Sequence, residues 1–208
     1  MSNINSLQKT QHIDPSIKID KTAIIDKGVE IGNHSKIWQW VHICSGAVIG
    51  ERCSFGQNVF VASKVNIGNN VKVQNNVSIY DNVVIEDNVF CGPSMVFTNV
   101  INPRAEISRK NEYKKTLIKS GVSLGANCTI ICGTSIGEYA FIAAGAVVTK
   151  DVKPFALMIG APARQTGWMS AYGEKIPLPL KGEGEWICDY SQTKYCLHGE
   201  NMKTNSLN

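Results

Sequence analysis

A basic segment interrupts an otherwise apolar stretch of this chain, and its side chains could bind a polyanionic ligand. Residues 103–117 read PRAEISRKNEYKKTL and hold five Lys or Arg residues against two Glu residues, with Arg104, Arg109 and Lys110 as candidate contacts. A guanidinium group matches phosphate or carboxylate oxygens through paired hydrogen bonds. A solvated loop explains the same composition, so a binding arm and a simple loop both stay open.

Cysteine and histidine residues near the C-terminus could ligate a metal, but their spacing does not favour it. Cys188, Cys196 and His198 offer three ligands, whereas a zinc site normally uses paired Cys-x2-Cys spacing and four ligands. The chain has seven cysteines, an odd number, and most stand singly among apolar residues, as buried thiols do. We therefore expect neither a metal nor disulfide bonds.

Composition places the chain among folded proteins and argues against several function classes. It has 208 residues, of which 43% are hydrophobic and 18% are charged, and its net charge is +4. That charge is too small and too scattered for nucleic-acid binding. The polar N-terminus lacks the apolar core of a secretory signal, and no apolar run reaches membrane-spanning length, so we expect a cytoplasmic protein with no membrane partner.

A six-residue repeat runs through most of the chain and predicts the elements that position these residues. Every sixth residue from Ile13 to Phe97 is apolar, and the frame resumes from Ile118 to Val148. The fifth residue of each unit is usually Val, Ala or Cys, and Gly often follows the leading aliphatic residue. Between Phe97 and Ile118 the repeat gains 15 residues, which are the basic segment.

This period fits neither an α-helix nor a flat amphipathic strand, whose side-chain periods are 3.6 and 2 residues. A short strand followed by a tight corner fits it, with the leading aliphatic residue inside and Gly, Asn or Asp at the corner, where positive φ is tolerated. Three units would close one triangular coil, and stacked coils would pair their backbones about 4.8 Å apart. An ordinary β-sandwich is the alternative, but its strands do not keep one frame for so long.

The pattern resembles the hexapeptide-repeat, left-handed parallel β-helix, one of the exceptions to right-handed crossovers. We therefore predict an all-β fold with about seven coils over residues 1–153 and one long loop inserted near 103–117. Residues 154–208 would form a C-terminal extension, with a short helix at 163–174 and a possible hairpin after 185. The N-terminal segment and this extension would cover the open strand edges at the two ends of the stack.

Three runs carry a more specific resemblance. They read VQNNVSIYDNVVIEDNVFCGPSMVFTNVINPRAEI, GANCTIICGTSIGEYAFIAAGAVVTKDV and GAPARQTGWMSAYGE. Together with the hexapeptides they resemble the acyl-CoA-dependent hexapeptide transferases, and among these the bacterial sugar-nucleotide N-acetyltransferases that act on UDP-2-acetamido-3-amino-2,3-dideoxy-glucuronate. The resemblance spans residues 19–179.

This resemblance implies a homotrimer that binds acetyl-CoA in the groove between neighbouring β-helices. The acceptor sugar nucleotide would lie in the same groove, nearer the middle coils. The implied reaction transfers an acetyl group to the 3-amino group of the sugar, in the synthesis of O-antigen or another surface polysaccharide. No nucleic acid is an implied partner.

Many members of the superfamily place a histidine general base directly before the long loop, and this chain departs from that pattern. The corresponding position is Asn102, and no histidine lies between His42 and His198. A hydroxyl acceptor needs a base as it attacks, whereas a deprotonated amine is already nucleophilic. Asn99 or Asn102 could orient such an amine through its side-chain oxygen, although Asn is also a common corner residue. His42 could instead be a base, a stacking partner for uracil, or a plain surface histidine.

The remaining candidate contacts of the sugar nucleotide are polar or charged. The nucleotide and the sugar could be bound by polar side chains at successive coils, namely Gln57, Asn58, Gln74, Asn76 and Tyr80. The pyrophosphate or a sugar carboxylate could meet Arg104 together with Arg109 or Lys110.

For CoA, small residues would let the pantetheine approach the backbone, and basic residues would meet its phosphates. The small residues are Ala144, Gly145 and Ala161, and the basic ones are Lys150 and Arg164.

Other functions stay open on the same fold. A dTDP-3-amino-3,6-dideoxyhexose N-acetyltransferase would use the same chemistry on a sugar without a carboxylate. A non-catalytic scaffold would have no need for the inserted loop or the GAPAR run. A γ-type carbonic anhydrase needs three zinc histidines, two of them closely spaced in later coils, and this chain offers only His12, His34, His42 and His198.

Overall fold

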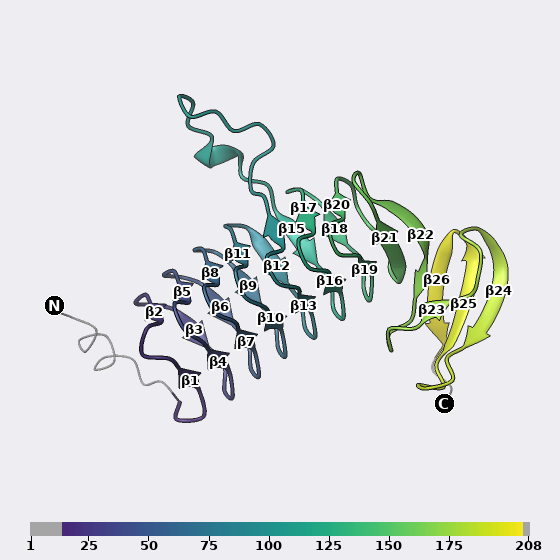
Figure 1. The fold of residues 1–208 in the computed structure, drawn as a ribbon, viewed down its shortest axis with the longest axis horizontal. Helices are drawn as coiled ribbons and strands as arrows, with labels where there is room; N and C mark the ends of the chain where they lie inside the picture. Colours follow the sequence, from purple (N-terminus) through teal and green to yellow (C-terminus); the bar gives the residue numbers. More distant parts are fainter. Residues whose placement is uncertain (1–13, 206–208) are drawn as a thin grey trace.

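The computed structural model describes residues 14–205, which form a left-handed parallel β-helix with a small antiparallel sheet at its C-terminal end (Figure 1). Each coil has three short strands, and each strand pairs in parallel with the strand one coil away, as Ile37 does with Phe55. The predicted fold is confirmed. Ile13, where the predicted frame starts, lies outside the described residues. No helix within residues 14–205 is long and apolar enough to cross a membrane.

The strands make three faces, named here in the order in which a coil visits them. The first face contains β1 (Lys18–Ile19), β4 (Lys36–Ile37), β7 (Ser54–Phe55), β10 (Lys72–Val73), β13 (Phe90–Cys91), β16 (Ser123–Leu124), β19 (Phe141–Ile142) and β21 (Ala156–Ile159). The second contains β2 (Ile24–Ile25), β5 (His42–Ile43), β8 (Phe60–Val61), β11 (Ser78–Ile79), β14 (Val96–Phe97), β17 (Thr129–Ile130) and β20 (Val147–Val148). The third contains β3 (Glu30–Ile31), β6 (Val48–Ile49), β9 (Asn66–Ile67), β12 (Val83–Ile85), β15 (Thr116–Ile118) and β18 (Ser135–Ile136).

The leading aliphatic residues of the repeat fill the inside of the stack. Phe55 and Ile79 are fully buried, and the small fifth residues Val59 and Val77 are buried beside them. These side chains belong to one hydrophobic cluster that continues from coil to coil. Burial of each large aliphatic side chain contributes roughly 1.5–3 kcal/mol, so the six-residue frame supplies the stability of the stack.

Three corners connect the faces. The first corner joins the first face to the second, and residues 56–58 are an example. The second corner joins the second face to the third, as at residues 44–46. The third corner, as at residues 50–52, leads to the first face of the next coil. The third residue of nearly every corner has a positive φ, for example 60° at Asn58 and 83° at Gly46. Asparagine and glycine suit these positions because they tolerate the left-handed region.

Glycine directly after the leading aliphatic residue is required by the close approach of the next coil, and not by the tolerance of positive φ that the six-residue pattern predicts for corner residues. Gly32 and Gly50 occupy such positions, and neither has a positive φ. A Cβ atom on Gly50 would lie 2.6 Å from the carbonyl carbon of Gly68 in the next coil, and one on Gly32 would lie 2.5 Å from the backbone nitrogen of Glu51. Close stacking of successive corners therefore selects glycine here.

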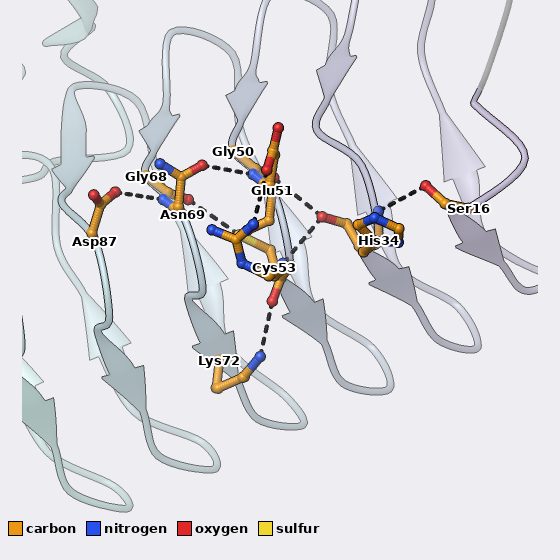
Figure 2. Close-up of polar contacts among 11 residues, drawn as sticks. Ser16, His34, Gly50, Glu51, Cys53, Gly68, Asn69, Lys72 and Asp87 are labelled. Carbon is orange, nitrogen blue, oxygen red and sulfur yellow. Dashed lines mark hydrogen bonds and ion pairs between the residues drawn. The ribbon is translucent and has the colours of Figure 1, made fainter.

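Polar side chains at the third corner satisfy backbone groups of the neighbouring coil (Figure 2). The Oδ1 of Asn69 accepts from the backbone N–H of Glu51 at 2.9 Å, and the Oδ1 of Asp87 accepts from the N–H of Asn69 at 2.6 Å. The Nζ of Lys72 donates to the carbonyl of Arg52 at 2.8 Å. Side chains of this kind pair corner N–H and C=O groups that the strands leave unpaired.

The inserted loop leaves the fifth coil at its second corner and projects away from the stack (Figure 1). It occupies residues 98–115 and contains one 3-10 turn, η1 (Lys110–Glu112). Stacking continues across it, since Ile85 pairs directly with Ile118. Thr116 and Leu117, predicted as the end of the loop, belong to β15 because they pair with β12 in the coil below.

The predicted helix at residues 163–174 is wrong, because residues 164–169 form the strand β22 (Arg164–Met169). Strand β21 ends the first face with an open edge, and antiparallel pairing with β22 satisfies its backbone groups. Strand β23 (Lys175–Ile176) extends this sheet. The fully buried Trp168 donates from Nε1 to the carbonyl of Pro179 at 2.9 Å, which fixes the extended chain beyond it.

The predicted hairpin is confirmed as a three-stranded antiparallel sheet of β24 (Gly182–Ile187), β25 (Lys194–Gly199) and β26 (Asn201–Asn205). Aromatic rings attach it to the last coils. Tyr139 stacks on Phe155 with ring centroids 5.5 Å apart, and Phe155 meets Tyr195 edge-on at 5.5 Å. The hydroxyl of Tyr195 also accepts from the N–H of Ala171 at 2.8 Å, so the sheet covers the C-terminal end of the stack.

Candidate functional site

An aromatic row on the second face leads toward the inserted loop. His42 and Phe60 are register partners in neighbouring strands, and their rings meet edge-on with centroids 5.8 Å apart. The ring of Tyr80, in the second corner of the following coil, lies 6.2 Å from that of Phe60. Because the loop leaves from the same corner one coil further on, the row ends at the base of the loop.

Asn99 lies in the neck of the loop, and Asn102 lies further out. The carbonyl of Asn99 accepts from the N–H of Lys114 at 3.0 Å, which closes the neck, and the Nδ2 of Asn82 donates to the carbonyl of Tyr113 at 3.4 Å. Asn99 is half-buried, whereas Asn102 is exposed. Within the described chain the side-chain amide of Asn99 has no hydrogen-bond partner, so it is available to a ligand.

His42 has a carboxylate and a thiol beside it. Its Nε2 lies 3.3 Å from Oδ1 of Asp26, in the coil below, and 3.9 Å from Sγ of Cys44. Burial, together with the negative charges of Asp26 and Asp81, raises the pKa of the Cys44 thiol. The carboxylate can orient the imidazole through this contact, as a catalytic base requires.

The structure separates the five polar residues predicted to line successive coils. Gln57, Asn58, Gln74 and Asn76 gather at the first corner, where Nδ2 of Asn58 donates to Oδ1 of Asn76 at 3.1 Å. Tyr80 lies at the second corner, on the opposite edge of the second face. The five therefore do not form one ladder: the four amides flank one side of this face, and Tyr80 and the loop flank the other.

The basic residues of the loop differ in their availability. Arg109 donates from Nη1 to both carboxylate oxygens of Glu112, at 2.9 and 3.0 Å, whereas its buried Nε has no hydrogen-bond partner within the described residues. The side chain of Arg104 is exposed, and within residues 14–205 its Nη1 donates to the carbonyl of Pro103 at 3.3 Å. Lys110 is also exposed. Arg104 and Lys110 are therefore loop cations that a ligand can reach, as are the exposed Lys114 and Lys115.

Most residues predicted to bind CoA gather at the C-terminal end of the second face. Ala144 and Gly145 lie in the first corner of the seventh coil. Residues 160–163 lie over the start of β20, where the N–H of Val147 donates to the carbonyl of Gly160 at 2.9 Å and the carbonyl of Val147 accepts from the N–H of Ala163 at 2.8 Å. Ala161 belongs to this overlying segment, and Arg164 follows it at the start of β22. Lys150 lies apart from this group, beyond β20, at the other edge of the face.

Two residues of this region were not predicted as site residues: Phe60 and Asp26. Phe60 occupies the outward position of its hexapeptide, one coil from His42, and Asp26 lies one coil below Cys44. Residues 18 apart in the sequence lie above one another in neighbouring coils, and comparing such pairs would have found both contacts. The six-residue frame alone does not, because it separates inward from outward positions without stating which outward residues meet.

Comparison with family models identifies the repeat. Residues 28–63 and 115–150 match the model described as "Bacterial transferase hexapeptide (six repeats)". Residues 46–81 match that of the "Hexapeptide repeat of succinyl-transferase".

Individual proteins give a longer match. The chain is 46% identical over 147 residues, which are 71% of this chain and 76% of the relative, to dTDP-3-amino-3,6-dideoxy-alpha-D-galactopyranose 3-N-acetyltransferase of Aneurinibacillus thermoaerophilus. Among solved structures, it is similar to a hexapeptide-repeat acetyltransferase of Vibrio cholerae complexed with acetyl coenzyme A, with 26% identity, a TM-score of 0.53 and coverage of 59% of this chain and 70% of that one. It is also similar to a galactoside acetyltransferase complexed with coenzyme A, with 30% identity, a TM-score of 0.53 and coverage of 59% and 64%.

Proposed function

The chain belongs to the bacterial hexapeptide-repeat transferases, and on this premise we propose that it is an acetyl-CoA-dependent N-acetyltransferase acting on the 3-amino group of a nucleotide-linked sugar. The observation that carries the proposal is the 46% identity to a sugar 3-N-acetyltransferase over a region that includes the loop neck and the second face. The product would be an N-acetylated amino sugar for a surface polysaccharide.

The sugar nucleotide is a dTDP-linked 3-amino-3,6-dideoxyhexose rather than a UDP-linked uronate. The dTDP-linked amino sugar is the substrate class in the name of the relative from Aneurinibacillus thermoaerophilus. The uronate needs a cation for its carboxylate, and the Nη1 of Arg109 already pairs with the Glu112 carboxylate. Arg104 and Lys110 remain for the pyrophosphate.

Acetyl-CoA is the acyl donor, as two similar solved structures hold acetyl coenzyme A or coenzyme A. Ala144, Gly145 and Ala161 have small side chains or none, so a pantetheine arm can approach the backbone there. The loop neck lies in the fifth coil and this group in the seventh, so the two are separated by roughly 10 Å along the axis. An extended pantetheine arm can span that separation and bring the thioester toward Asn99.

The active protein is a homotrimer with its sites between subunits. The second face supports this proposal because some of its outward side chains are apolar and exposed: Ile24 is 54% exposed and Val96 is 44% exposed, with the half-buried Phe60 between them. Apolar patches that cross several strands mark protein interfaces. A neighbouring subunit on this face would enclose the aromatic row and the loop neck.

The reaction needs no metal and no side-chain base. The unprotonated 3-amino nitrogen attacks the thioester carbonyl, a C–N bond forms, and the C–S bond breaks. CoA leaves as the thiolate, which takes up the proton lost from the new amide nitrogen. Asn99 orients the amine through its side-chain oxygen. His42, oriented by Asp26, is the alternative base.

An acetyl-transfer assay tests the proposal. The purified chain is given acetyl-CoA and a dTDP-linked 3-amino-3,6-dideoxyhexose, and release of free CoA is measured with the acetylated product. Turnover that requires the 3-amino group supports the proposal. If turnover is absent and acetyl-CoA also fails to raise the melting temperature, the chain is a β-helical scaffold, since a ligand at 100 times its Kd adds about 2.7 kcal/mol of stability.

A further inference from the structure

The side chains of Asp26, His42 and Cys44 form a compact cluster at the second corner of the first two coils. Pairing of Ile25 with Ile43 places Asp26 directly beneath Cys44, and His42 precedes Cys44 by two residues on the same outward side. The cluster combines a carboxylate, an imidazole and a thiol from two successive coils. It is therefore set by the stacking of the fold rather than by one flexible segment.

The geometry of the cluster differs from that of a catalytic relay. A Cys–His–Asp relay needs the thiol and the carboxylate on opposite ring nitrogens. Here Oδ1 of Asp26 and Sγ of Cys44 both approach Nε2 of His42, at 3.3 and 3.9 Å. All three atoms lie within 4.8 Å of one another. Tetrahedral zinc, with bonds of about 2.0–2.3 Å, separates its ligand atoms by about 3.3–3.8 Å.

The surroundings hold these side chains in place, and in the single chain the cluster stays partly exposed. The N–H of Ser45 donates to Oδ2 of Asp26 at 3.3 Å, which turns Oδ1 toward the imidazole. Phe60 supports the ring of His42 from the side, and the side chains of His42 and Asp26 are each 39% exposed. In the described residues the one ion pair of Asp26 is with His42, so no Lys or Arg neutralises this carboxylate. Supporting contacts of this kind orient metal ligands in proteins.

We propose that Asp26, His42 and Cys44 form a three-ligand site for a divalent transition metal, with zinc as the preferred ion. A thiolate and an imidazole select zinc over magnesium and calcium, which take oxygen ligands. Binding forms the metal–sulfur bond and releases the thiol proton to solvent. Water occupies the fourth position. The site shares His42 with the aromatic row, whereas the acetyl transfer proposed above uses no metal.

Cobalt titration of the untagged full-length chain tests this site. The protein is stripped with a chelator, freed of it, kept reduced with a phosphine, and titrated with Co2+. We expect one Co2+ per chain and a near-ultraviolet thiolate-to-cobalt charge-transfer band that Zn2+ then abolishes. Cys44→Ser should remove the band, and Asp26→Asn should keep it while weakening Co2+ affinity about 100-fold or more.

The matched control is Cys196→Ser. Sγ of Cys196 lies 3.8 Å from Oε1 of Glu185, and His198 follows it on the same strand, so these residues are the rival ligands. The control variant should titrate like the parent chain. No band in the parent, a band that survives Cys44→Ser, or a band lost in Cys196→Ser overturns the proposal.

Alkylation keeps the test valid if a variant fails to fold. Cys44 is half-buried, whereas the other six cysteines are buried, so iodoacetamide should modify Cys44 first in the native chain. We expect Zn2+ to slow that modification at least tenfold, as mass spectrometry of the Cys44 peptide would show. Equal modification with and without Zn2+ contradicts the proposed site.

Discussion

The backbone N–H of Lys114 donates a hydrogen bond of 3.0 Å to the carbonyl of Asn99, and this bond closes the neck of the inserted loop. It fixes Asn99 at the second corner, one coil beyond Tyr80, so the side-chain amide stays at the end of the aromatic row. Asn102 lies further along the loop and is exposed. Asn99 is therefore the residue that we expect to position the acceptor amine.

Replacement of Asn99 by Ala should reduce the rate of acetyl transfer without abolishing it. Loss of an orienting hydrogen bond should lower kcat by about 10- to 100-fold, whereas loss of a general base costs about 10²–10⁴-fold. Asn102→Ala, in the exposed part of the same loop, is the matched control and should stay within about threefold of the parent. A larger loss in Asn102→Ala than in Asn99→Ala would reverse the assignment.

The pH dependence of kcat/KM should show that no histidine acts as the base. Activity should rise with pH through a single ionisation, that of the substrate amine, because only the unprotonated amine attacks. This limb should persist in His42→Asn and in His34→Asn, the control at an exposed corner away from the second face. A loss of about 10⁴-fold in His42→Asn together with disappearance of the limb would make His42 the base.

The sugar specificity should follow the charge of the hexose. Nη1 of Arg109 is paired to Glu112, so if Arg104 binds the pyrophosphate, a sugar carboxylate has no free guanidinium for a bidentate contact. An unpaired charged hydrogen bond costs about 10- to 150-fold in kcat/KM. We expect the dTDP-linked 6-deoxy sugar to be preferred over the UDP-linked uronate by that factor. The comparison variant is Arg104→Gln. Preferred turnover of the uronate, lost selectively in Arg104→Gln, would restore the uronate assignment.

The inward frame should not tolerate charge. Ile79 is fully buried, so Ile79→Asp places a carboxylate inside the coil without a partner and should prevent folding. Asn66→Asp, at an exposed outward position of β9 in the third face, should leave the fold intact. Circular dichroism and size-exclusion chromatography distinguish the two. A folded Ile79→Asp chain with an unchanged melting temperature would disprove the frame.

Two glycines should respond in opposite ways to substitution. A Cβ on Gly50 meets the backbone of the next coil, so Gly50→Ala should lower the free energy of unfolding by about 2 kcal/mol or more. Gly46 has a φ of 83° with nothing near its Cβ position, so Gly46→Asn should change it by less than about 1 kcal/mol. Denaturant titration measures both. Equal effects would mean that backbone conformation, rather than stacking distance, selects both glycines.

The sequence by itself determined the coil, its inward frame and the position of the insertion. A side chain such as Ile79 points inward because the strand-and-corner unit is six residues long, and that length is a property of the local chain. The same reasoning located the loop, because Ile118 resumes the frame after it. These features depend on contacts within one hexapeptide or between consecutive ones.

Only the tertiary structure decided which outward residues meet. The contacts of His42 with Asp26 and Phe60 join successive coils. The separation of Tyr80 from the amides at the first corner depends on the position of each corner in the triangular coil. Residues 164–169 form a strand and not the predicted helix because they pair with the open edge of β21. This pairing outweighs the local preference for a helix. Hydrogen bonding between coils and at the end of the stack fixes these features, and a six-residue pattern carries no information about it.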